Sequence, residues 1–201
     1  MKITKFHEDA LRELGNMAAG KASSSLSSMV DKKVNLSPPA IDIIPIKKIP
    51  ELLGGQKKMI VGIYSKLSGN VYGTMMIVMP IKSAMSLSDI MLNKKSGSTK
   101  ALSQKDQENL IKIGNVMIHN YLNVLINFLG MKTECEKPRI VSTFGESLPD
   151  FILLGTKTKY TILLRTDFKI SKNVEGDVIL SIEVESVPKF IGALEKKLKK
   201  G

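Results

Sequence analysis

Near the start of the chain, hydrophobic residues recur every three or four positions, which is the spacing of one face of an α-helix. The positions that form this apolar stripe are Leu11, Leu14, Ala18, Ala22, Leu26 and Met29. Thr4 precedes the stripe as a candidate N-cap, so the pattern predicts a helix over about residues 5–30. A second stretch of this kind, "LIKIGNVMIHNYLNVLINFLG", follows Ser103 and predicts a helix over about 104–130.

Shorter segments rich in β-branched residues follow each predicted helix. After the first helix, we expect extended segments at 33–37 and 40–46, a turn or short helix near 49–55, a hairpin of 59–67 and 70–79, and a helix over 82–92. After a polar linker at 93–100 and the second helix, we expect extended segments at 131–135 and 139–144, a turn or short helix near 146–151, strands at 159–168 and 176–185, and a helix from Pro188. The same order of elements therefore occurs twice.

The repetition extends to individual residues. An offset of 99 aligns Gly15-Asn16 with Gly114-Asn115, Leu26 with Leu125 and Pro39 with Pro138, and an offset of 103 aligns "NVYG" at 70–73 with "NVEG" at 173–176. We therefore predict an α+β fold with an internal duplication and a pseudo-twofold axis, in which two long helices pack on a largely antiparallel sheet. The expected unit is one domain over 1–201, made of halves at about 1–99 and 100–201. Gly15 and Gly114 are expected where the two long helices pack closely together.

The composition argues against a membrane-spanning protein and bears on the kind of partner the chain binds. No apolar stretch approaches the roughly 20 residues of a membrane span, and Cys135 is the one cysteine of the sequence. We therefore expect a cytoplasmic protein without membrane insertion. The net charge of +11 favours acidic partners, of which nucleic acid is one. Tryptophan is absent and no nucleic-acid-binding signature is found, so nucleic acid is an unlikely partner and remains a third alternative for the function.

The sequence lacks the common catalytic signatures. It contains no phosphate-binding glycine loop, no GxSxG, no HExxH and no Cys-x-x-Cys motif. His7 and His119 are far apart in the sequence and suggest no metal site. We expect the protein to hold no metal or cofactor of its own.

Three polar residues remain as candidates for function. At about 100° per residue, Asp9, Glu13 and Asn16 fall within roughly 60° of one another, nearly opposite the apolar stripe. By itself such a row is typical of an ordinary solvated helix face. Ala19 and Gly20, however, are the neighbours of Asn16 one turn later, and their small size would let a partner approach closely.

The spacing of this row resembles a family signature. Asp9-x3-Glu13-x2-Asn16-x22-Pro39 is similar to the D/S-x3-E-x2-N-x22-P pattern of the CheC, CheX and FliY family of chemotaxis phosphatases, and the chain length and two copies resemble the CheC type most. The resemblance implies hydrolysis of the aspartyl phosphate of the response regulator CheY-P. It also implies CheD, a receptor-modifying deamidase, as a regulatory partner.

The resemblance also implies a role for each residue. Asn16 would hold the attacking water in line with the phosphorus atom, because an amide oxygen can accept a hydrogen bond from water. Glu13 would pair with a lysine of the regulator, Asp9 would assist from the rim, and Pro39 would shape the chain. The bound regulator would supply the magnesium ion.

The second copy departs from this pattern. Glu108 replaces the aspartate, Lys112 replaces the glutamate, and Asn115 and Pro138 are retained. A lysine at the docking position would repel the regulator's lysine, so we predict one competent site and one degenerate site. Ile118 and His119 are also expected to crowd Asn115. The alternative function is a non-catalytic module that binds a regulator or a component of the flagellar switch.

Overall fold

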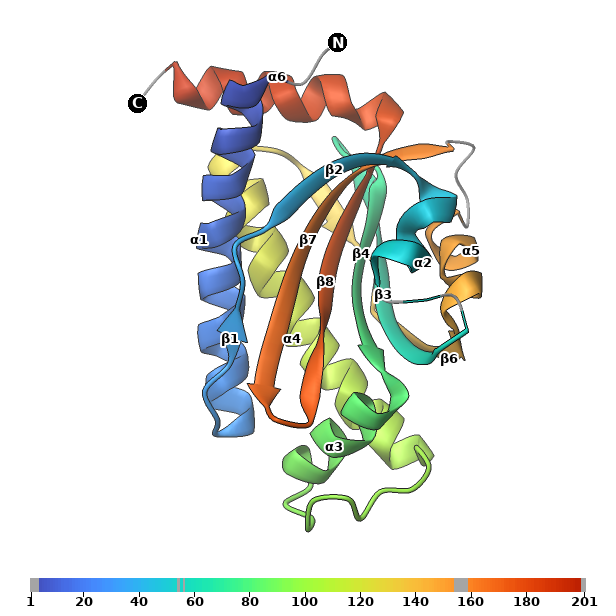
Figure 1. Cartoon of the computed structure of the whole chain (residues 1–201). Coiled ribbons are helices and arrows are strands. Elements are labelled where there is room, and N and C mark those ends of the chain that lie inside the picture. Colours follow the sequence, from blue (N-terminus) through green and yellow to red (C-terminus); the bar gives the residue numbers. More distant parts are fainter. Residues whose placement is uncertain (1–3, 54, 56, 154–158, 200–201) are drawn as a thin grey trace.

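The two long helices form one layer of the fold. The structure is a computed structural model that describes residues 4–53, 55, 57–153 and 159–199. Helices α1 (Lys5–Val30) and α4 (Gln104–Leu129) lie side by side, run in opposite directions and cover one face of the sheet (Figure 1). Thr4 and Ser103 are their N-caps, as predicted, and each begins a capping box.

The sheet is antiparallel throughout its described pairings. Its strands are β1 (Asn35–Leu36), β2 (Ala40–Pro45), β3 (Met59–Gly69), β4 (Gly73–Pro80), β5 (Thr133–Cys135), β6 (Arg139–Phe144), β7 (Tyr160–Ser171) and β8 (Val174–Glu183). The remaining helices are α2 (Ile49–Leu52), α3 (Ile81–Met91), α5 (Leu148–Leu153) and α6 (Val187–Leu198), with 3-10 turns at Ile46–Lys48, Gly145–Ser147 and Val184–Ser186. The predicted α+β fold, with two long helices on a largely antiparallel sheet, is confirmed.

The strand order shows how the repeated segments combine. The order is β1-β7-β8-β4-β3-β5, with β2 also paired to β7 and β6 also paired to β3. The first strands after α1 thus pair with the second hairpin, and the first strands after α4 pair with the first hairpin. The two hairpins meet where β4 pairs with β8. Each repeat therefore completes the sheet of the other.

The repeated glycines lie at this central pairing. A methyl group on Gly73 would overlap the carbonyl oxygen of Ser181, and one on Gly176 would lie 2.5 Å from the carbonyl oxygen of Val78. Ser181 and Val78 are 103 positions apart, the same offset that relates the two glycines. The repeated N-V-x-G motif thus has a packing reason, because only glycine lets the two central strands approach this closely.

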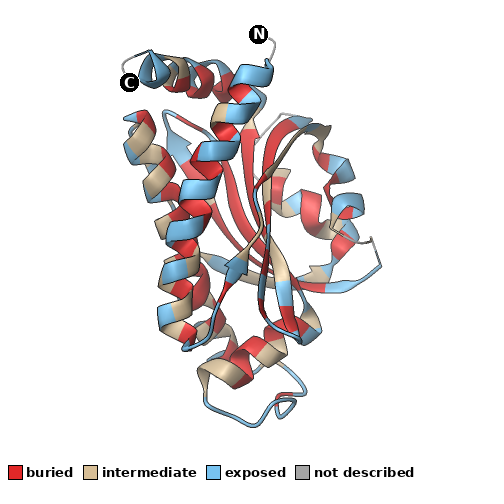
Figure 2. Cartoon of the chain, turned by 60° about the vertical axis from the view of Figure 1, so that its left-hand side comes forward, coloured by how far each residue is buried: buried red, intermediate tan, exposed pale blue. Residues whose placement is uncertain are grey.

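Hydrophobic side chains are buried on both faces of the sheet. The larger core lies between the sheet and the α1–α4 layer, and a smaller one lies between the sheet and α2 and α5 (Figure 2). Lys66 and Arg165, which are related by the offset of 99, bind the short helices: Lys66 Nζ lies 2.7 Å from the carbonyl oxygen of Ile152, and Arg165 donates to that of Leu52. Within the described part of the chain, no helix has the length and apolar character that a membrane span requires.

Candidate functional site

The predicted polar row occupies the outer face of α1. Asp9, Glu13 and Asn16 are all exposed, while the apolar stripe on the opposite side is buried against the sheet and α4 (Figure 2). Among the described residues, none forms a hydrogen bond or ion pair with these three side chains. Their carboxylate and amide groups are therefore available to a partner molecule.

Pro39 packs beneath this row. It is buried between β1 and β2, and a methyl group on Gly15 would lie 2.5 Å from Pro39 Cγ and 3.5 Å from Tyr121 Oη of α4. The nearest neighbour of Gly15 is thus the proline and not α4. The prediction that Gly15 and Gly114 serve the packing of the long helices on each other was wrong, since a methyl group on Gly114 would overlap Ile63 of β3.

Two serines of α1 bind the segment that leads into β1. This contact was not predicted from the sequence. The Ser23 hydroxyl donates to the carbonyl oxygen of Val34 at 2.6 Å, and the Val34 N–H donates to Ser27 Oγ at 3.0 Å. These bonds join α1 to the chain just before β1, about two to three turns after Asn16. The run "SSSLSS" was the available signal, because closely spaced serines on a helix often bond to nearby backbone.

The residues beside Asn16 one turn further along α1 have little or no side chain. A methyl group on Gly20 would have no heavy atom of a neighbouring element within 4 Å, and Ala19 is buried. The exposed neighbour of Asn16 one turn later therefore adds no side chain to the surface. This geometry lets a partner approach the Asn16 amide closely.

The second copy on α4 is arranged differently. Glu108, Lys112 and Asn115 are exposed, but Glu108 accepts a hydrogen bond from Gln104 Nε2 at 3.0 Å and Lys112 donates to Asn109 Oδ1 at 3.4 Å. Both contacts lie within α4. The two charged side chains are therefore already engaged with neighbours on their own helix.

Of the two bulkier neighbours of Asn115, only His119 lies at the surface. Nδ1 of His119 lies 2.9 Å from the backbone carbonyl oxygen of Asn115, which places the ring beside the asparagine. Ile118, by contrast, is fully buried, so the prediction that it crowds Asn115 was wrong. Pro138 is half-buried between β5 and β6, and Gly114 packs on Ile63 instead of on this proline. Pro39 therefore packs on the glycine of its motif, whereas Pro138 does not.

Metal ligands are not grouped in the part of the chain that the structure describes. There, no set of three or more histidine, cysteine, aspartate or glutamate side chains is placed to hold a metal ion. The candidate site consists of a carboxylate and an amide on an exposed helix. Such a site can bind and orient a partner's reactive group, and it offers no activated nucleophile of its own.

Comparison with known proteins relates the segment that carries the candidate site to a known family. The model of the CheC-like family matches residues 6–43, which contain the polar row and Pro39. This segment is similar to the CheC-like family. The chain is 20% identical over 197 residues to the CheY-P phosphatase CheC of Bacillus subtilis, with 94% of each chain covered. The resemblance to CheC-type chemotaxis phosphatases that the motif predicts is confirmed.

Solved structures share the fold. FliY of Thermotoga maritima matches with a TM-score of 0.79 and 17% identity, covering 98% of this chain and 100% of that one. The FliM middle domain of H. pylori matches with a TM-score of 0.69 and 13% identity, covering 95% and 99%. A CheX from Borrelia burgdorferi, solved in a complex with CheY, BeF3 and magnesium, matches with a TM-score of 0.56 and 18% identity, covering 85% and 96%.

Proposed function

We propose that this CheC-like protein hydrolyses the aspartyl phosphate of a CheY-type response regulator. The observation that carries the proposal is the pair of Glu13 and Asn16, exposed one turn apart on α1 and without a hydrogen bond or ion pair to another described residue. The name of the Bacillus subtilis relative supports the same reaction. The protein is then an enzyme of the phosphatase class that acts on another protein.

The proposed chemistry needs little from the enzyme. The oxygen of a water molecule attacks phosphorus, the bond between phosphorus and the aspartyl oxygen breaks, and inorganic phosphate leaves as the carboxylate is restored. Asn16 accepts a hydrogen bond from the water and holds it in line with the breaking bond. The regulator brings the magnesium ion that neutralises charge on the phosphoryl group, so no metal site on this chain takes part.

Glu13 and Asp9 serve docking in this proposal. Glu13 lies one turn before Asn16 and pairs with a lysine of the regulator, which fixes the position of the phosphoryl group relative to the amide. Asp9 lies one further turn away and orients the regulator from the rim. Pro39 acts indirectly, because it packs on Gly15 and so supports the backbone beside Asn16.

The α4 copy is proposed to be a degenerate site. Lys112 places a positive charge where the first copy has a carboxylate, and the ring of His119 lies beside Asn115. A regulator that presents a lysine would be repelled at this helix. We also propose CheD as a regulatory partner and the cytoplasm as the place of action, both on the family resemblance alone.

A non-catalytic binding module is the second candidate. The likeness of the fold to the FliM middle domain favours it, while the intact Asp9, Glu13 and Asn16 row favours the phosphatase. The experiment is to add the purified protein to phosphorylated CheY, with and without CheD, and to measure phosphate release and complex formation. Accelerated release supports the phosphatase. Binding without acceleration under both conditions supports the module and contradicts the proposed reaction.

A further inference from the structure

The linker between α3 and α4 is held in place by two buried carboxylates. Asp89 accepts hydrogen bonds from the N–H groups of Gly97, Ser98 and Thr99 at 2.7–3.0 Å and from the Thr99 hydroxyl at 2.7 Å. Burial alone would raise the pKa of Asp89, but these bonds outweigh it and lower the pKa. Asp89 is thus a charged anchor that fixes the shape of the linker.

Asp106 is the second anchor. It accepts hydrogen bonds from Ser103 and from the Ser88 hydroxyl at 2.6 Å, and its carboxylate lies 3.2 Å from Lys94 Nζ. The bonds from Ser103 and Ser88 hold the pKa of Asp106 well below its usual range. The linker, which the sequence predicts to be polar, is therefore held at residues 97–99, directly before the exposed Lys100.

Three lysines from separate elements line two neighbouring cavities beside this linker, which share Lys82 and Ser86. Lys82 of α3 lines two adjoining cavities of 380 and 300 Å³; Lys172, in the turn between β7 and β8, borders the first and Lys100 borders the second. Ser86 borders both cavities and offers a hydroxyl group between the lysines. We call Lys82, Ser86, Lys100 and Lys172 the basic channel.

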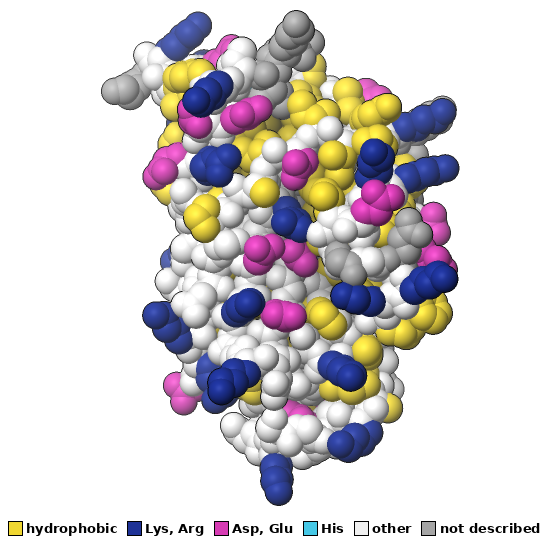
Figure 3. Space-filling model, in the orientation of Figure 1, with side chains coloured by type: hydrophobic (Ala, Val, Ile, Leu, Met, Phe, Trp, Pro, Cys, Tyr) yellow, Lys and Arg dark blue, Asp and Glu magenta, His cyan; other side chains and the backbone are white. Residues whose placement is uncertain are grey.

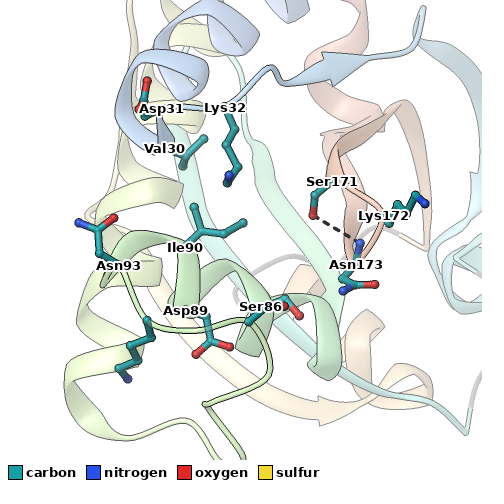
Figure 4. A pocket seen from close by; sticks show the side chains of 12 residues that line it. Val30, Asp31, Lys32, Ser86, Asp89, Ile90, Asn93, Ser171, Lys172 and Asn173 are labelled. Atoms are coloured by element: carbon teal, nitrogen blue, oxygen red, sulfur yellow. Dashed lines mark hydrogen bonds between the residues drawn. The ribbon is translucent and has the colours of Figure 1, made fainter.

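A third cavity of 570 Å³ adjoins the basic channel. Figure 4 shows Lys32, just after α1, pointing into it, with Ser86 on α3, Ser171 at the end of β7 and Asn173 in the β7–β8 turn around it. Lys32 and Lys94 follow the C-terminal ends of α1 and α3, where a cation stabilises the helix dipole. The dipoles of α1 and α3 therefore explain why lysines occur at these two positions.

Local structure does not account for Lys82. It lies in the first turn of α3, where a positive charge is unfavourable, and Pro80 provides no side-chain cap for the N–H groups there. Glu175 is the one acidic residue that lines the first cavity, and it is paired with Lys169 at 3.9 Å. Asp89 lines the second cavity, but its carboxylate is bonded to the linker at residues 97–99. The three lysines of the channel therefore outnumber the two carboxylates that line it, and both carboxylates already have partners.

We infer that the basic channel binds an acidic segment of a partner protein. Figure 3 shows Lys and Arg side chains around the lower end of the molecule, where α3 lies, and the carboxylates of aspartate and glutamate complement separate lysine charges. None of the residues that line the two cavities of the channel is a strongly exposed large hydrophobic side chain of the kind that insertion into a lipid surface requires. None of these lining residues is aromatic, so the channel offers no ring on which a nucleic-acid base could stack.

The test uses a short fluorescent poly-glutamate peptide and the full-length chain. The channel variant is Lys82→Glu, Lys100→Glu and Lys172→Glu combined, and the control is Lys189→Glu, Lys196→Glu and Lys199→Glu, on or beside α6 at the opposite end of the molecule. Both variants carry the same net charge. The channel variant should bind the peptide about tenfold more weakly than the parent chain, and the control should bind within about twofold.

If the channel variant and the control variant lose peptide binding equally, the peptide responds only to the net charge of the protein. That result would overturn the inference. A DNA duplex or anionic vesicles that bind more tightly than the peptide at equal salt, and lose binding in the channel variant, would also overturn it. Should the glutamate variant fail to fold by circular dichroism, the corresponding Lys→Gln variant replaces it. Unchanged peptide binding in that folded variant would count against the channel.

Discussion

Gly15 and Pro39 are in direct contact, with the proline ring filling the space that a side chain of Gly15 would occupy. The glycine directly precedes Asn16, and the proline lies between β1 and β2. The contact therefore joins the helix that carries the candidate site to the strand segment beside it. It explains why the helix tolerates a glycine in its interior and why a proline at a fixed distance belongs to the motif.

Replacing this glycine should lower stability. In Gly15→Ala the new methyl group lies 2.5 Å from Pro39 Cγ, so the ring or the helix has to move, and we expect a loss of about 1–3 kcal/mol in the free energy of unfolding. Gly20→Ala is the matched control, because its methyl group meets open space and alanine favours the helix by about 1 kcal/mol. Urea denaturation measures both. A Gly15→Ala variant as stable as Gly20→Ala would contradict the packing account.

The helices and their caps were predictable because their signals are local. Thr4 and Ser103 directly precede the apolar periodicity, and both cap as expected. The repeated N-V-x-G motif indicated duplication, but not that each repeat pairs with strands of the other, because strand pairing depends on contacts distant in sequence. The contact of Gly15 with Pro39 was missed for the same reason.

The candidate site was predictable in its exposure and only partly in its surroundings. Asp9, Glu13 and Asn16 lie on one exposed face because their spacing follows the helical repeat. Ile118 was misjudged because a residue three positions from an exposed asparagine can still point into the core. The anchoring of the α3–α4 linker by Asp89 was also not predictable, since it depends on a turn that brings backbone N–H groups to a buried carboxylate.

Replacing either of the repeated glycines at the centre of the sheet should also lower the stability of the fold. Gly73→Ala and Gly176→Ala each place a methyl group against the backbone carbonyl of the facing strand, which cannot move as a flexible side chain can. We expect each variant to lose at least about 2 kcal/mol of unfolding free energy in urea. Gly192→Ala, on α6 with open space around it, is the control. A loss confined to one central glycine would show that their environments are not equivalent.

Asp177 should make stability depend on pH. It faces Asp167 across β7 and β8, and burial raises its pKa to about 7, with the hydrogen bond to Asp167 adding to the rise and Arg165 opposing it. Because the folded state holds this proton more tightly, the stabilisation is complete below about pH 4 and is lost as the pH rises through about 7. After allowance for solvent screening, we expect a loss of about 1–2 kcal/mol.

The check compares the parent chain with Asp177→Asn by urea denaturation at several pH values. The asparagine variant lacks this proton, so its stability should change less between pH 4 and 8. Glu185→Gln, an exposed carboxylate near the end of the sheet, is the matched control and should retain the parent's dependence. Parallel curves for the parent and Asp177→Asn would contradict the raised pKa.

The most direct test of the proposed function compares the two asparagines. Decay of phosphorylated CheY is measured with the parent protein, with Asn16→Ala and with Asn115→Ala, each at equal concentration and after its fold is verified. Loss of the water-positioning amide should reduce the rate about 100-fold in Asn16→Ala, whereas Asn115→Ala should stay within about twofold of the parent. Equal losses in the two variants, or full activity in Asn16→Ala, would contradict the account.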